Sequence, residues 1–361
     1  MKLDVMKIVR IVKIKRESVT DVFISFIAVI AALLVGAVIV YISGSSPLEA
    51  YKALYEGAFG STYDFAQTLT RTTPLIFTGL TVAFAFRCGL FNIGGEGQLY
   101  VGGMTAAIVG ISFTGLPIYV HLPLALGAGA AAGGAWSLVP SVLKARVGAH
   151  EVITTIMMNY IGILLCSYLA NYSFKAEGWV AQTDVVEPSA QLPKLVPGTQ
   201  LTASIFVALA CVVIAYYILY KTTLGYEIRA VGLNPTAAEY GGISVQKSIV
   251  VAMLISGMLA GLGGTGEVLG LHRRFIFGFS PGYGFDGIAV AVLGRNHPVG
   301  VVLGALLFGA LRNGGMVMKQ MTNVPTDLVI VIQGIVILFV AAPEMFRIFR
   351  RIRKGGIRNA F

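Results

Sequence analysis

Residues 201–269 read LTASIFVALACVVIAYYILYKTTLGYEIRAVGLNPTAAEYGGISVQKSIVVAMLISGMLAGLGGTGEVL. The stretch holds two apolar runs, Leu201 to Tyr220 and Ile249 to Leu269, and each has about the 20 residues that a helix needs to cross the hydrocarbon core of a bilayer. The segment between them, 221–247, is polar and carries charges of both signs. The pattern therefore predicts two membrane-spanning helices joined by a loop in water.

The loop carries its own helix signals. Asn234 can accept hydrogen bonds from the free N–H groups that open a helix, and Pro235 suits the first helical position. The helix is expected to continue to Tyr240 and to stop at Gly241 and Gly242. A short exposed helix between two spans suits being gripped and moved by another protein, and an ordinary capped loop helix fits the same residues.

Composition places most of the chain in the bilayer. Of 361 residues, 56% are hydrophobic and 12% are charged, with a mean hydropathy of +0.79, whereas soluble domains carry about 25% charged residues. We expect an all-α polytopic membrane domain over residues 22–342, with about ten membrane helices. The other long apolar runs are Val22 to Ile42, His121 to Leu143, Val152 to Tyr172, Val299 to Met316 and Val324 to Ala342. Shorter or glycine-interrupted runs, typical of broken or re-entrant helices, are Pro74 to Arg87, Gly94 to Phe113 and Gly284 to Leu293.

The net charge of +10 comes largely from the two ends of the chain. Six of the 27 Lys and Arg residues lie between Lys2 and Arg16, and six lie between Arg347 and Arg358. The positive-inside rule therefore predicts that the basic segment 1–21, the loop 221–247 and the basic tail 343–361 all face the cytoplasm. This distribution indicates a bilayer rather than nucleic acid as the partner. Arg273 and Arg274 conflict with this orientation, since a chain that crosses the membrane with each successive helix places them outside.

The sequence lacks the motifs of metal sites, phosphate-binding loops and catalytic nucleophiles. Cys88, Cys166 and Cys211 have no paired spacing, and the four histidines have no metal-ligand spacing, so no metal site is predicted. No phosphate-binding loop and no nucleophile motif occurs, so we expect no catalytic residues and no cofactor bound by this chain. Gly257 and Gly261, like other glycine pairs at this spacing, indicate helix packing.

Polar residues inside apolar runs are the candidates for a substrate pathway. The segment Phe91 to Gln98 interrupts two runs with glycines, and it contains Asn92 and Glu96. Glu96, Glu267 and Asp286 are costly at bilayer depth unless they are paired or hydrated, which makes each a functional hypothesis. The structural alternative is an internal ion pair, for instance of Arg87 with Glu96, that holds a broken helix together.

A second candidate segment is aromatic. Phe275 to Gly287 places closely spaced rings, including Phe285, beside glycines, which suits stacking against a flat substrate or an interfacial aromatic belt. Asn159 lies within an apolar run, where its amide suits either a ligand or a bond between helices.

Three of these segments together resemble a known family. The segment Phe91 to Gln98, the loop Arg229 to Ile243 and the segment Gly287 to Gly300 are similar, in this order along the chain, to the branched-chain amino acid, ribose and nucleoside permeases of ABC importers, most closely the nucleoside members. The resemblance implies that the loop couples the permease to ATPases. The expected coupling residues are Arg229, Gly232, Asn234, Pro235, Ala238, Glu239, Gly241 and Gly242. The chain departs from the general pattern in having Ala237-Ala238-Glu239 rather than Glu-Ala-Ala.

The resemblance also implies partners and a location. They are two ATPase domains that bind ATP and Mg²⁺, a second and often non-identical permease, and an external solute-binding protein, at a bacterial cytoplasmic membrane. The cargo is expected to be a nucleoside, with sugar or branched-chain amino acid as alternatives. The expected pathway residues are Phe91, Asn92, Glu96, Gln98, Asn159, Phe285 and Asp286. Two rival classes remain, an ion-coupled secondary transporter using Glu96, Glu267 or Asp286, and an intramembrane enzyme.

Overall fold

The computed structural model describes residues 30–322, 324, 327–335 and 338. Within these residues the structure is helical, with two isolated β-bridges. The basic segment 1–21 and the tail 343–361 lie outside the described residues, as does part of each of the first and last apolar runs. The helices are Ile30–Ile42, α2 (Pro47–Phe59), α3 (Thr62–Arg87), α4 (Gly95–Ser112), α5 (Ile118–Val147), α6 (Glu151–Tyr168), α7 (Ser204–Lys221), α8 (Thr223–Leu233), α9 (Pro235–Tyr240), α10 (Val245–Gly266), α11 (Tyr283–Leu293), α12 (Pro298–Thr322) and residues 327–335. Two π-helical segments, η1 (Leu169–Ser173) and η3 (Glu267–His272), continue α6 and α10, and η2 (Pro188–Ala190) is a 3₁₀ turn.

The chain forms two compact units. The larger comprises residues 56–314 and contains every candidate site residue, and the smaller comprises residues up to 55 together with those from 315 onward. In the smaller unit the Tyr51 hydroxyl donates to the Leu33 carbonyl, and Gly36 lies against Ile332.

Six of the described helical segments are long and apolar enough to cross a membrane, and two further apolar helices are shorter. The long ones are Thr62–Arg87, Ile118–Val147, Glu151–Ser173, Ser204–Lys221, Val245–His272 and Pro298–Thr322; the short ones are Ile30–Ile42 and Tyr283–Leu293. The all-α polytopic prediction is confirmed. The number of about ten membrane helices stays a prediction, because it includes residues that the structure does not describe.

Helix α3 is longer than the sequence indicated. Only Pro74 to Arg87 was expected to be helical, yet the helix begins at Thr62 and is 26 residues long. Its first half is rich in threonine, and these hydroxyls donate to carbonyls four residues earlier, as Thr70 does to Ala66 and Thr72 to Thr68. Because the hydroxyls are satisfied within the helix, a segment that is polar in composition is compatible with an apolar environment.

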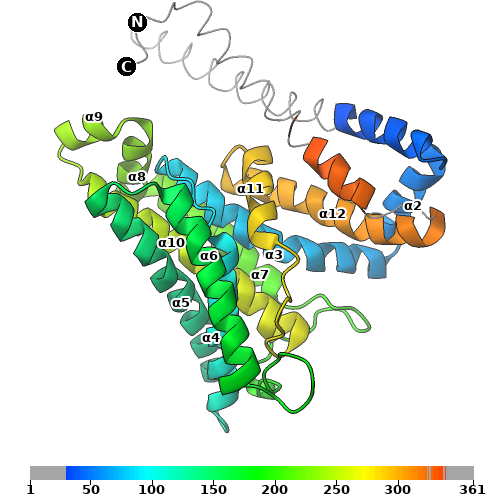
Figure 1. Ribbon diagram of the computed structural model, residues 1–361, viewed down its shortest axis with the longest axis horizontal. Helices are drawn as coiled ribbons and strands as arrows, with labels where there is room; N and C mark the ends of the chain where they lie inside the picture. Colours follow the sequence, from blue (N-terminus) through cyan, green and yellow to red (C-terminus); the bar gives the residue numbers. More distant parts are fainter. Residues whose placement is uncertain (1–29, 323, 325–326, 336–337, 339–361) are drawn as a thin grey trace, which may run out of the picture. The chain divides into compact units, whose positions relative to one another are not determined.

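Helix α10 lies at the centre of the larger unit, packed against α3, α4 and α5 (Figure 1). Its glycines allow very close approach of backbones. A Cβ added at Gly257 would stand 2.5 Å from the Gly133 carbonyl oxygen of α5, and one at Gly133 would stand 2.7 Å from the Gly261 Cα. These contacts confirm that Gly257 and Gly261 serve helix packing.

Candidate functional site

Helices α8 and α9 project together at one end of the larger unit (Figure 1). Asn234 ends α8 and caps α9, because its Oδ1 accepts from the Ala237 N–H at 3.0 Å. Pro235 occupies the first position of α9, and Gly242 adopts the left-handed φ of 82° that follows the helix end. The local structure expected for residues 234–242 is confirmed.

Helices α8 and α9, together called the hairpin, expose both polar and apolar side chains at their tip. Glu239 is exposed, whereas Ala238 is buried and faces inward. Leu233 is 88% exposed and Tyr240 is 92% exposed. Single exposed apolar residues are ordinary, but a nearly fully exposed leucine at the end of α8 and tyrosine at the end of α9 favour contact with another protein.

The hairpin is attached to the rest of the unit at Gly232. A Cβ added there would stand 2.9 Å from the Arg87 carbonyl carbon and closer still to its oxygen, so α8 packs backbone to backbone on the end of α3. Arg229 and Arg87 both lie over the Tyr220 ring of α7, with their guanidinium carbons 5.2 and 5.7 Å from its centroid. Movement of α8 would therefore act directly on α3 and α7.

Arg87 is also bonded to the turn between α11 and α12. Its Nε donates to the Asn296 carbonyl at 2.8 Å, and His297 in the same turn lies 5.4 Å from the Tyr220 ring. The suggested Arg87–Glu96 ion pair is therefore wrong. The physical reason is that Arg87 ends α3, whereas the chain turns back before Glu96 and carries that carboxylate toward α11.

Asn92, Gln98 and Asn159 meet in a buried network at the break between α3 and α4. Asn92 Nδ2 donates to Gln98 Oε1 at 3.1 Å and to Ser256 Oγ of α10 at 2.8 Å. Asn159 of α6 donates to the Ile93 carbonyl and accepts from the Gly97 N–H, both at 2.7 Å. Backbone groups at the break are thereby satisfied by Asn159 of α6, and Ser256 of α10 holds the Asn92 side chain.

Glu96 connects α4 to α11. Its Oε2 accepts from the Gly284 N–H at 2.6 Å, and a Cβ at Gly284 would stand 2.6 Å from the Glu96 Cα. Glu96 is 3% exposed and sits at the N-terminus of α11, where a carboxylate is favourable. Together with the amide network, this arrangement accounts for these side chains structurally, and their role in a substrate pathway stays a prediction.

The remaining pathway candidates, Phe91, Phe285 and Asp286, take no part in the hydrogen bonds of the amide network. Phe91 packs edge-on against Phe86, with centroids 4.9 Å apart, at the end of α3. Phe285 is 47% exposed on α11. Asp286 of the same helix forms an ion pair with Arg312 of α12, at 3.1 Å between Oδ2 and Nη2. Arg312 was missed from the sequence, although an arginine inside the apolar run Val299 to Met316 was a signal that could have found it.

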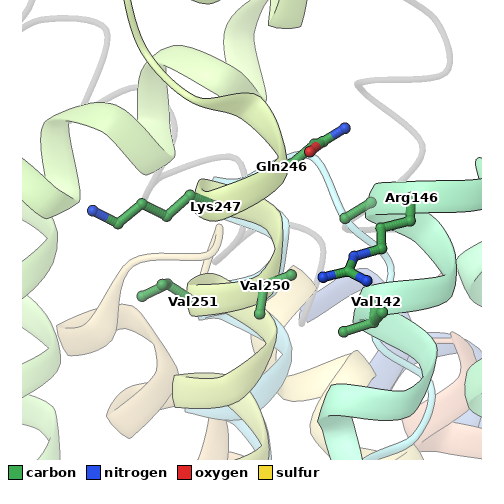
Figure 2. A pocket seen from close by; sticks show the side chains of 7 residues that line it. Val142, Arg146, Gln246, Lys247, Val250 and Val251 are labelled. Carbon is green, nitrogen blue, oxygen red and sulfur yellow. The ribbon is translucent and has the colours of Figure 1, made fainter.

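Two cavities lie at opposite ends of α10. The first, of about 290 Å³, lies between α5 and the first turns of α10, beside the hairpin. Figure 2 shows Arg146 reaching from α5 toward α10, while Lys247 points away. The second, of about 410 Å³, lies between the loop after η1 and Arg274, with Lys175, Glu177 and Asp184 in its wall. Neither cavity is lined by the expected pathway residues.

The geometry defines a polytopic α-helical membrane protein with an exposed two-helix projection that packs on the ends of the interior helices. Comparison with known proteins assigns it further. Residues 65–341 match the family described as branched-chain amino acid transport system / permease component, and the chain belongs to this family.

Three relatives carry names that describe their transport systems. The guanosine ABC transporter permease protein NupP of Bacillus subtilis is 44% identical over 347 residues, which cover 94% of this chain and 99% of the relative. The glucose ABC transporter permease protein TsgB13 of Haloferax volcanii is 36% identical, with 90% and 88% covered. The guanosine ABC transporter permease protein NupQ of Bacillus subtilis is 32% identical, with 67% and 78% covered. No solved structure matches the chain.

Proposed function

We propose that this chain is the membrane-spanning permease subunit of an ATP-driven importer for nucleosides. The observation that carries the proposal is the 44% identity to a guanosine permease across 99% of that relative's length. Glucose is the second candidate cargo, because a glucose permease is 36% identical over most of its length.

The proposed complex contains a second, non-identical permease, two ATPase domains that hold ATP and Mg²⁺, and an external binding protein. Two different guanosine permeases from one Bacillus, NupP and NupQ, both match this chain, which supports pairing of non-identical permeases. The hairpin end is proposed to face the cytoplasm of a bacterial cell, with both termini on that side, because cations gather at the chain ends and in the loop 221–247.

The proposed mechanism uses α9 as the contact for the ATPases. Closure of the ATPases on ATP would push Tyr240 and Glu239, and α8 would pass the movement through Gly232 to the end of α3. Four residues lie between the end of α9 and the start of α10, and α10 packs against α3, α4 and α5. A displacement of the hairpin would thus move the central helices. For ATP to switch the permease between its outward-open and inward-open states, the ATPases must contact the hairpin differently in the two states.

Uptake by the reconstituted complex tests the proposal. Vesicles that hold this chain, its partner permease and the ATPases, supplied with binding protein, are expected to accumulate labelled guanosine only with ATP, and to ignore glucose and leucine. Tyr240→Ala with Glu239→Lys should abolish ATPase association, whereas Lys175→Ala, at the other end, should not. Accumulation by the purified chain alone on an ion gradient would instead establish a secondary transporter.

A further inference from the structure

A group of charged side chains lies inside the larger unit near the end of α10 that is remote from α9. Glu267 opens the π-helical segment η3, and His272 closes it. Twenty-two residues separate Val245 from Glu267, a distance of about 33 Å at 1.5 Å per residue. The group therefore lies close to the side opposite the hairpin, where cargo enters in the proposed orientation.

The π-helical turn is what brings Glu267 and His272 together. They are five positions apart, and the wider turn, which bonds i to i+5, places both on one side of the helix. Their Oε2 and Nε2 atoms are 4.0 Å apart, which is too long for a hydrogen bond. Single π-helical turns inside α-helices occur frequently at functional sites.

Glu267 is buried without a hydrogen bond to its Oε2. The residue is 5% exposed, and no group among the described residues donates to this oxygen. His272 Nε2 and Arg312 Nη1 likewise have no hydrogen-bond partner within the described part of the chain. Leaving a buried polar atom unpaired is costly, so three such atoms in neighbouring residues indicate a place that another molecule fills.

The charges of this group limit the kind of ligand. Arg71 and Arg312 both attract the Glu267 carboxylate, Arg312 holds Asp286 at 3.1 Å, and Arg312 also attracts Glu96. Two arginines thus lie among three carboxylates. A phosphate would add negative charge to this group, whereas a neutral molecule with hydroxyl groups can donate to Glu267 and accept from His272 or Arg312 without adding charge.

Aromatic rings border the same group. The Arg312 guanidinium carbon lies 5.2 Å from the Tyr283 ring centroid, and His272 meets Phe279 edge-on at 6.1 Å. Phe277 joins these rings through Tyr100, whose centroid lies 6.4 Å from that of Phe277 and 4.9 Å from that of Phe279, and Phe277 and Phe285 are 41% and 47% exposed. Hydroxyl-binding polar atoms beside open aromatic rings match the two halves of a nucleoside, its ribose and its base.

We propose that Glu267, His272 and Arg312 form the permease's contact site for the ribose of the transported nucleoside. Glu267 accepts hydrogen bonds from the vicinal 2′- and 3′-hydroxyls, and His272 and Arg312 donate to the ribose oxygens. The base lies toward Phe277 and Phe285. This inference rests on the proposed function, and it assigns the specificity for a ribose diol to residues of this chain rather than only to the external binding protein.

The test compares guanosine with 2′,3′-dideoxyguanosine in the complete reconstituted transporter, using one binding protein throughout. The ratio of the two uptake rates cancels the contribution of that binding protein. In Glu267→Gln the ratio is expected to fall about tenfold, because the neutral amide offers one acceptor oxygen in place of the two of the carboxylate, which weakens hydrogen bonding to the ribonucleoside alone. The matched control Glu151→Gln removes a carboxylate that pairs with Lys144 at 2.9 Å near the other end, and its ratio should equal that of the wild type.

Each outcome of this test supports or overturns the assignment of the ribose site. An unchanged ratio in Glu267→Gln, or an equal loss of both nucleosides, overturns the assignment of the ribose site. Where Glu267→Gln fails to assemble with its ATPases, His272→Gln, which changes a partly exposed side chain, must lower the ratio, and an unchanged ratio there overturns the assignment as well. A wild-type complex that carries glucose and no nucleoside refutes the proposed function itself, and that result is separate from the ratio.

Discussion

The contact of Gly232 with the end of α3 leads to a prediction that can be worked through in detail. The change is Gly232→Ala. Its Cβ would stand 2.9 Å from the Arg87 carbonyl carbon and 3.0 Å from the Cys88 carbonyl carbon. Ordinary carbon contacts lie at about 3.5 Å, so the two backbones must separate by at least about 0.6 Å, and further to clear the Arg87 carbonyl oxygen, which is closer still. Both atoms belong to the backbone, so no side-chain rotation relieves the contact.

Two opposing energies decide whether Gly232→Ala weakens or strengthens the packing of α8 on α3. Alanine is favoured over glycine inside a helix by about 1 kcal/mol, and less at the second-last residue of α8. Overpacking costs about 1–3 kcal/mol. The cost outweighs the gain, so we expect α8 to separate from α3 more often in the variant.

Cys88 offers a local measurement of this separation. The residue is 3% exposed, and burial raises the pKa of its thiol to about 12, so it is protected from alkylation while α8 is in place. If labelling proceeds through the separated state, a cost of about 1–3 kcal/mol corresponds to labelling that is faster by about 5- to 150-fold. Alkylation at pH 8, followed by mass spectrometry of the peptide that contains Cys88, gives this rate directly.

Gly241→Ala is the matched control. Its Cβ would stand 3.2 Å from the Ala238 carbonyl, and its φ of −77° is ordinary for alanine, so Cys88 labelling should stay at the wild-type rate. Equal labelling of Cys88 in Gly232→Ala and in the wild type, together with unchanged ATP-dependent uptake, would refute the inference that α8 transmits movement through this contact.

Two further predictions concern other parts of the larger unit. Asn159→Ala leaves the Ile93 carbonyl and the Gly97 N–H without their side-chain partner, which should lower the free energy of unfolding by about 2–6 kcal/mol and lower the melting temperature. The control is Asn171→Ala, which removes hydrogen bonds only to Ser167 in its own helical segment and should change the melting temperature little. Equal melting temperatures of the two variants would contradict the bridging role of Asn159. Burial and the nearby Arg87 lower the pKa of His297 below its usual 6.5, so the unfolded chain takes up a proton first as the pH falls. The stability that the neutral imidazole contributes is therefore present above pH 6.5 and is lost as the pH falls through the folded-state pKa. His297→Gln should reduce the fall in melting temperature between pH 7.5 and 5.5, and an identical fall in variant and wild type would show that His297 does not contribute.

Local signals in the sequence were sufficient wherever the structure depends on neighbours along the chain. The cap at Asn234, the start of α9 at Pro235 and its end before Gly242 follow from residues within nine positions of one another. Composition was a poorer guide for α3, because the threonine hydroxyls that look polar in the sequence are satisfied inside the helix. The bilayer location of the long apolar helices followed from their length and composition alone.

The partners of the charged residues depended on the tertiary structure. The sequence alone indicated that Glu96, Glu267 and Asp286 were costly in an apolar setting, but it suggested a wrong partner for Glu96, since Arg87 bonds to a turn more than 200 residues away. The grouping of Glu267 with His272 and Arg312 likewise required a π-helical turn and the packing of α12. The physical reason is that burial cost is a property of one side chain, whereas the partner that offsets it is chosen by how distant helices meet.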